Sequence, residues 1–137
     1  MVNPAGYSGT PLAKKLGMKD GYQCFFHQLP DYYFNLFNEM PDIEPVERLT
    51  DESLDFAHVF VIWKADMETI APKVKAALKK TGMVWLSWPK QKSGLETDLN
   101  SNIVRAYGLD IGLVDTKVAA VDDTWSGFKF MYRIKDR

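Results

Sequence analysis

Two uninterrupted apolar runs constrain the fold of this chain more than any other feature of its sequence. The first, FAHVFVIW, covers residues 56–63, and the second, MVWLSW, covers residues 83–88. In both runs consecutive positions are apolar, whereas a strand with one face in water alternates apolar and polar residues. The runs therefore predict two central strands of a parallel sheet that other elements cover on both faces.

Segments with helical or extended patterns surround these runs. Helices are expected where apolar residues recur at helical spacing between capping signals: Thr10–Pro11 to Gly17, Pro30–Asp31 through Met40, a stripe from Met67 to Leu78 that Gly82 ends, and Thr97 or Asp98 through Ala106 to Gly108. Further strands are expected at Gln23 to His27, Val46 to Leu49 as a short edge, LVDTKVAAV and FKFMYRI. The loop DDTWSG between the last two is so short that they must form an antiparallel hairpin. Pro72 is expected to kink or restart its helix, because proline removes one internal hydrogen bond.

No repeat, low-complexity tract or linker divides the 137 residues, so we expect one domain over residues 1–137. The alternation of strands and helices predicts a three-layer α/β fold with a mostly parallel sheet.

Composition excludes several classes of partner. The net charge of -1 and the pI of about 6.1 leave no basic field that could hold nucleic acid. No apolar run is long enough to span a bilayer, and the N-terminus lacks the features of a signal peptide. A single cysteine, Cys24, cannot form an intrachain disulfide, and we interpret it as a small buried hydrophobe. We therefore expect a cytoplasmic protein with no nucleic-acid or membrane partner.

From Val59 onward the order of elements is similar to the C-terminal half of class I (Rossmann-like) methyltransferases. The shared order is strand, helix, the strand in TGMVWLSWP, helix, strand and a reversed final strand. In that family the final strand inserts antiparallel beside its neighbour, which implies the same for residues 128–134. The expected sheet is six-stranded, mostly parallel and in the order 2-1-3-4-6-5, with the last strand antiparallel between the fourth and fifth.

A second resemblance covers nearly the whole chain. The segments AGYSGTPLAKKLG, SWPKQKSGLETDLNSNIVR and VDDTWSGFKF look like the signatures of a small, uncharacterised bacterial family that is catalogued only as a domain of unknown function. This resemblance implies no activity, because that family has no established one.

The turn after the first strand departs from the methyltransferase pattern. Such enzymes have a glycine-rich turn there, so that backbone can approach the cofactor. Here HQLPDYYF follows the strand, and no glycine occurs between Gly21 and Gly82. We therefore expect no cofactor, and specifically no S-adenosylmethionine.

A candidate site lies where strands leave the sheet. In open α/β sheets ligands bind beyond the carboxyl ends of the strands, and the loops after residues 88 and 121 project from that edge. Indole faces, lysines and hydroxyls there suit a small polar ligand. The candidate ligand-binding residues are Trp88, Lys90, Ser93, Asp122, Asp123, Trp125 and Ser126.

Each candidate also has a plainer interpretation. Lys90 either binds an anion or forms a salt bridge with Asp122 or Asp123. The two aspartates form either an acid-base pair or ordinary turn residues. The two histidines, His27 and His58, have no metal-ligand spacing; we expect a hydrogen-bonded core position for His58 and a ligand contact as one option for His27.

Two functions are compatible with this pattern. Our leading prediction is a non-enzymatic binding or regulatory module for a small ligand or a protein partner. The alternative is a small-molecule enzyme related to class I methyltransferases, with a degenerate cofactor loop. An aromatic content of 13% also leaves a homodimer open.

Overall fold

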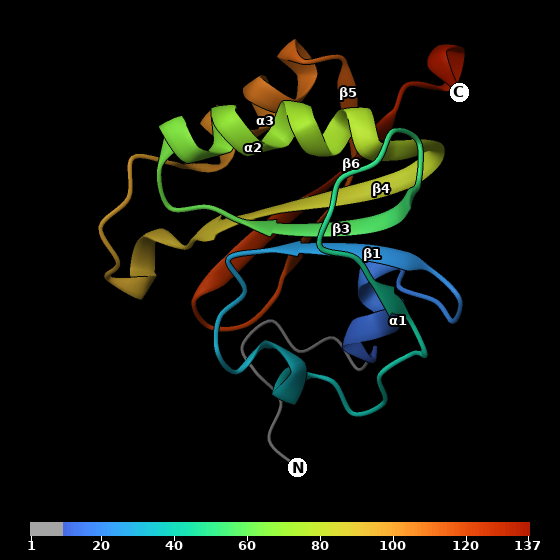
Figure 1. Ribbon diagram of the computed structural model, residues 1–137. Helices are drawn as coiled ribbons and strands as arrows, with labels where there is room; N and C mark the ends of the chain where they lie inside the picture. Colours follow the sequence, from blue (N-terminus) through green and yellow to red (C-terminus); the bar gives the residue numbers. More distant parts are fainter. Residues whose placement is uncertain (1–9) are drawn as a thin grey trace.

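The computed structural model describes residues 10–137 and contains a six-stranded sheet in the order β2-β1-β3-β4-β6-β5 (Figure 1). The strands are β1 (Gln23–His27), β2 (Glu44–Pro45), β3 (Leu54–Phe60), β4 (Leu78–Pro89), β5 (Leu113–Ala120) and β6 (Trp125–Tyr132). Strands β2, β1, β3 and β4 pair in parallel, and β6 pairs antiparallel with both β4 and β5. The predicted fold class and strand order are confirmed.

Helices cover the two faces of the sheet unequally. The helices are α1 (Leu12–Leu16), α2 (Lys64–Ala77) and α3 (Ser101–Asp110), with short 3-10 helices η1 (Tyr33–Leu36), η2 (Gln91–Ser93) and η3 (Ile134–Asp136). Figure 1 shows α2 and α3 together over one face, which we call the α2/α3 face. The opposite face, the α1 face, carries α1, η1 and long loops.

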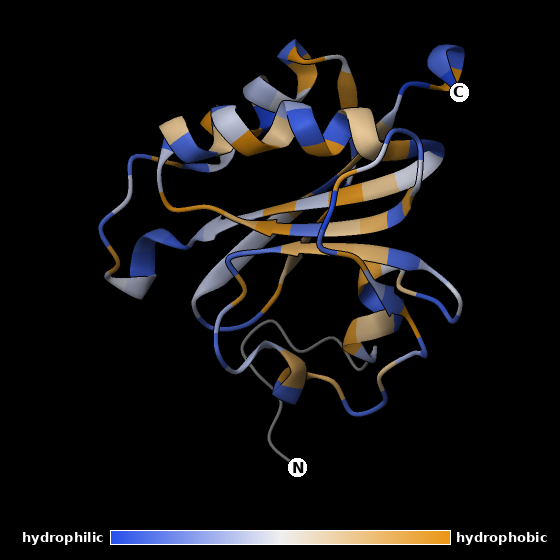
Figure 2. Ribbon diagram, viewed as in Figure 1, coloured by the Kyte–Doolittle hydropathy of each residue, from blue (hydrophilic) through white to orange (hydrophobic). Residues whose placement is uncertain are grey.

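Apolar residues follow one another along the central strands (Figure 2), and their side chains are buried on both faces of the sheet. On the α2/α3 face, Met67, Val74 and Val104 are fully buried against β3, β4 and β6. On the α1 face, Leu16 packs against Trp85, and the Trp85 indole N–H donates to the Leu16 carbonyl at 2.7 Å. Burial on both faces explains why the runs at β3 and β4 are apolar at consecutive positions.

The predicted helix over residues 30–40 forms only one 3-10 turn, η1. Tyr33 is fully buried, and its ring meets Phe26, Phe37 and Phe60 edge-on, 5.2 to 5.7 Å between centroids. Aromatic side chains at helical spacing therefore pack here as a cluster around Tyr33, and tertiary packing overrides local periodicity.

Glycines that were expected to end helices lie inside elements. Gly82 is within β4, where an added Cβ would lie 2.6 Å from the Leu54 carbonyl oxygen, so β3 and β4 can approach closely. Gly108 lies inside α3, which begins after Asn100 and not after Thr97 or Asp98; the Asn100 side chain accepts from the Ile103 N–H at 2.9 Å.

Helix α2 runs continuously through Pro72. A proline at this position leaves the carbonyl four residues earlier, that of Glu68, without its helical donor. The Tyr107 hydroxyl of α3 donates to that carbonyl at 3.3 Å. The expected restart is therefore absent, because the neighbouring helix supplies the missing hydrogen bond.

Candidate functional site

The topological switch point of the sheet lies between the carboxyl ends of β1 and β3. The chain leaves β1 toward η1 on the α1 face, and it leaves β3 toward α2 on the other face (Figure 1). Because the two connections diverge, the strand ends between them are not covered by a crossover, and this is where open α/β sheets bind ligands.

Polar groups from two elements meet at this switch point. His27, the last residue of β1, and Asp66, in the first turn of α2, approach to 3.4 Å between Nε2 and Oδ2. Their side chains are 21% and 28% exposed, so a ligand could reach both. Trp63, directly before α2, is 47% exposed. The switch point thus offers an imidazole, a carboxylate and an accessible indole.

Gln28 makes the turn after β1 with a φ of 53°, in the left-handed region that glycine usually occupies. The turn that brings backbone to the edge of the sheet is therefore present without a glycine. Unlike glycine, Gln28 places a side chain at this turn. That side chain is exposed and lies outside the core. Leu29 is half-buried against the cluster of Tyr33, Phe60, Val121 and Trp125.

A pocket of about 580 Å³ lies further along the same edge, between the end of β4, the following loop, the start of α3 and the start of β6. Of the predicted site residues, Trp88, Lys90 and Ser126 line it. Trp88 and Ser126 are cross-strand partners in the β4–β6 register, which explains why they share one face.

The other predicted residues lie elsewhere on this edge. Trp125 pairs with Pro89, one position from the Trp88–Ser126 pair, so its side chain belongs to the α1 face and packs on Phe60. The indoles of Trp88 and Trp125 are therefore separated by the sheet. Ser93 accepts from the Leu95 N–H at 3.2 Å, and Asp123 is exposed.

Asp122 has a structural task in the β5–β6 turn. Its Oδ1 accepts from the backbone N–H groups of Thr124 and Trp125, both at 2.8 Å, although the residue is only 5% exposed. Burial, followed by a hydrogen bond with the Asp122 side chain, raises the pKa of Tyr32 to about 12. The ion pairs formed within residues 10–137 do not join Lys90 to either aspartate.

The loop after β4 is tied to the switch point. The Thr97 hydroxyl donates to the carbonyl of Ile62, in the connection between β3 and α2, and Asp98 accepts from the Lys64 N–H at 2.7 Å. Asp98, expected to cap the helix that follows it, instead caps the first turn of α2. The pocket and the switch point are therefore held next to each other.

His58 occupies the predicted hydrogen-bonded core position. Its ring is fully buried, 2.9 Å from the Tyr33 hydroxyl and 2.7 Å from the Ser87 hydroxyl, and burial lowers its pKa to about 3. This position, sealed on both faces of the sheet, gives a substrate no access to the imidazole.

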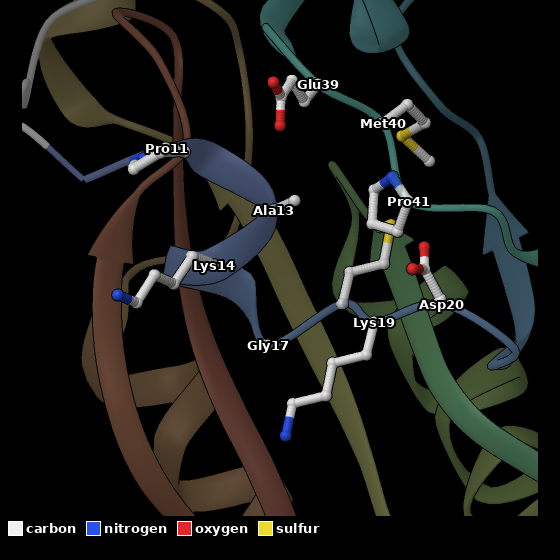
Figure 3. A pocket seen from close by; sticks show the side chains of 10 residues that line it. Pro11, Ala13, Lys14, Gly17, Lys19, Asp20, Glu39, Met40 and Pro41 are labelled. Carbon is white, nitrogen blue, oxygen red and sulfur yellow. The ribbon is translucent and has the colours of Figure 1, made fainter.

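A second pocket, of about 520 Å³, opens on the α1 face (Figure 3). Its wall on one side comes from α1 and the residues after it, including Lys14 and Lys19, and on the other from Glu39, Met40 and Pro41. This pocket was not predicted from the sequence, because residues 39–41 were expected to end a helix.

Within the part of the chain that the structure describes, no group of three or more histidine, cysteine or acidic side chains could hold a metal ion. No helix among those residues has the length and apolar character needed to cross a membrane.

Comparison with known proteins identifies the fold. No protein-family model and no curated protein match the chain. Solved structures do match. A protein from Sulfolobus solfataricus assigned to the type 11 methyltransferases matches at 13% identity and a TM-score of 0.62 over 89% of each chain. An S-adenosylmethionine-dependent methyltransferase from Aquifex aeolicus matches at 14% identity and a TM-score of 0.58 over 89% of this chain and 88% of that one. The 1,6-didemethyltoxoflavin-N1-methyltransferase of Burkholderia thailandensis, solved with S-adenosylhomocysteine, matches at 10% identity and a TM-score of 0.57 over 87% of this chain and 73% of that one. At these identities the matches establish a methyltransferase-like fold, and the resemblance to the uncharacterised bacterial family stays a prediction.

These neighbours overturn two of our predictions. The leading prediction of a non-enzymatic module is contradicted, because the three solved structures named above, which share the fold over 87 to 89% of this chain, are described as methyltransferases. The prediction of no cofactor, and of no S-adenosylmethionine, is contradicted by the dependence of these neighbours on that cofactor. The error came from treating glycine as a requirement for the turn after β1, whereas Gln28 adopts the same left-handed conformation.

Sequence reasoning missed Gln28 and Asp66 altogether. Nothing in the local sequence marks a left-handed glutamine. An acidic residue in the first turn of a helix is also common, because it suits the helix dipole, so Asp66 carried no functional signal.

Proposed function

We propose that this protein is a small-molecule enzyme of the class I methyltransferase type that binds S-adenosylmethionine at the switch point between β1 and β3. One observation carries the proposal: a sheet with the topology of S-adenosylmethionine-dependent enzymes has accessible polar groups, His27 and Asp66, at its switch point. We further propose that the chain acts as one cytoplasmic domain, and that it belongs to the bacterial family whose signature segments it resembles.

The residues at the switch point fit a nucleoside in three respects. Gln28 lets backbone turn sharply at the strand end, His27 and Asp66 supply hydrogen-bonding groups, and Trp63 presents an indole surface on which a base can stack. The departure is the Gln28 side chain, which occupies space that glycine leaves free.

S-adenosylmethionine, when bound, supplies an electrophilic methyl group. The tasks of the protein are then to hold the cofactor, orient the acceptor and exclude water. His27 and Gln28 would contact the cofactor, and Asp66 would fix the His27 ring by the contact that the two side chains already make. The pocket beside Trp88 is the available space for an acceptor.

Isothermal titration of the purified protein with S-adenosylmethionine and S-adenosylhomocysteine tests the proposal. We expect binding of at least one of them in the micromolar range. Asp66→Asn should weaken it by about tenfold, the effect of one charge-assisted hydrogen bond of about 1.5 kcal/mol.

Asp115→Asn is the matched control. Asp115 is a similarly exposed carboxylate, 3.1 Å from Arg105 Nε on the far part of the sheet, and its loss should leave cofactor affinity unchanged. The absence of binding at millimolar concentrations of both compounds would refute the proposal.

A further inference from the structure

The pocket at the end of β4 has an apolar base and a polar rim. Trp88 is only 5% exposed, and its indole stacks on Phe128 at 5.1 Å with 29° between the planes. Leu99 is buried beside it, whereas Leu95 on the loop is 46% exposed. An indole and two leucines suit a planar, apolar body of a size that a volume of about 580 Å³ accepts.

Lys90 brings the positive charge to this pocket. Its backbone N–H donates to the Thr124 carbonyl at 2.7 Å. This hydrogen bond holds the Lys90 backbone beside the start of β6. Among the ion pairs that the described residues form, none includes Lys90.

The remaining polar side chains, apart from Glu96, can all donate hydrogen bonds. Gln91, Asn100, Ser101 and Ser126 line the pocket with amide and hydroxyl groups. Asn100 already uses its Oδ1 to cap α3, which leaves its NH₂ group as a donor. Glu96 is the one carboxylate in the lining, and it disfavours a ligand with several negative charges.

We infer that this pocket binds a monoanionic aromatic carboxylate, with the ring against Trp88 and Leu99 and the carboxylate beside Lys90. Its role as the methyl acceptor rests on the proposed function, whereas its binding does not. The inference gives the enzyme a substrate class, that of small aromatic acids.

A titration followed by NMR tests this inference. The four tryptophans each give one indole N–H signal in ¹⁵N-labelled protein. The probes are 4-hydroxybenzoate and its neutral counterpart 4-hydroxybenzamide, which share the ring and differ in charge. We expect 4-hydroxybenzoate to shift the Trp88 signal and to leave that of Trp85, which is buried against Leu16, in place.

Two lysine variants separate a specific contact from general charge. Lys90→Gln should weaken 4-hydroxybenzoate binding by about tenfold or more, the range for a hydrogen bond to a charged group, and should leave 4-hydroxybenzamide unaffected. Lys92→Gln, on the same loop but outside the pocket lining, should change neither.

The outcomes distinguish this inference from the proposed function. Equal affinity for acid and amide, equal effects of the two variants, or no shift of Trp88 at millimolar probe would each overturn the inference. Titration of the same samples with S-adenosylhomocysteine reports on the cofactor separately, so binding of the cofactor without the acid refutes only the substrate class.

Discussion

His58 has no contact with water, and its two ring nitrogens are both occupied, by the hydroxyl groups of Tyr33 and Ser87. The three residues come from η1, β3 and β4, so the network joins the loop after β1 to two central strands. A buried polar group without a partner costs about 1–3 kcal/mol, so this network favours the one packing that satisfies all three groups.

The burial of His58 predicts a pH dependence of stability. The folded protein keeps the ring neutral down to about pH 3, whereas the unfolded chain takes up a proton below the ordinary value of 6.5. Between these limits the unfolded state binds more protons, so stability falls as the pH falls, by about 1.4 kcal/mol per pH unit from this residue.

His58→Gln removes this titration and keeps hydrogen-bonding groups. We expect the difference in unfolding free energy between native protein and variant, from urea denaturation, to shrink by up to about 2 kcal/mol between pH 7 and pH 5. A difference that stays constant over this range would show that His58 does not remain neutral in the fold.

Cys24 should be chemically inert in the native state. Burial, with a smaller contribution from the charge of Asp55, raises the pKa of its thiol to about 12, and its side chain is inaccessible. Because the thiolate is the reactive species, we expect no reaction with Ellman's reagent at pH 8 in the folded protein and one equivalent after denaturation in urea. Rapid modification of the folded protein would contradict the burial of β1.

At the scale of elements, α3 depends on the absence of a side chain at Gly108. An added Cβ would lie 2.2 Å from Phe130 Cε1, so the helix rests directly on the aromatic ring of β6. From the sequence, Gly108 was predicted to end the helix. Glycine is typical both of a helix C-cap and of a position where two elements pack closely, so the local sequence does not distinguish the two.

Gly108→Ala is therefore expected to destabilise the protein. Alanine is the better helix former by about 1 kcal/mol, but we expect the clash with Phe130 to dominate and the net loss to be about 1–3 kcal/mol in urea denaturation. Phe130→Leu provides the companion variant: in the double variant, the loss caused by Gly108→Ala should be smaller than in the native background. Stabilisation by Gly108→Ala alone would contradict the contact.

Local patterns predicted some elements well and others poorly, for identifiable reasons. The strand Gln23–His27 was predicted with its exact bounds, and both central strands were found, because burial on two faces leaves a strong apolar signal. The prediction of a helix over residues 30–40 was wrong, because the apolar side chains of this segment pack around Tyr33. The edge strand lies at Glu44–Pro45 and not at residues 46–49, since two residues of pairing carry little pattern.

At the scale of the whole molecule, topology could be predicted further than the site. The carboxyl edge of the sheet follows from strand order, and Trp88, Lys90 and Ser126 were placed on one pocket from sequence alone. Trp125 was assigned to the same rim, but the alternation of side chains along β6 directs it to the other face. The contact between His27 and Asp66 joins residues 39 positions apart in the sequence, so no local pattern could predict it.

A crystal structure of the protein grown with S-adenosylhomocysteine would show whether the carboxyl ends of β1 and β3 hold the adenosyl cofactor. We expect electron density for the nucleoside at the switch point, in contact with His27 or Gln28 and within reach of Trp63. Density for the nucleoside at another surface, or an unchanged switch point at saturating ligand, would contradict it.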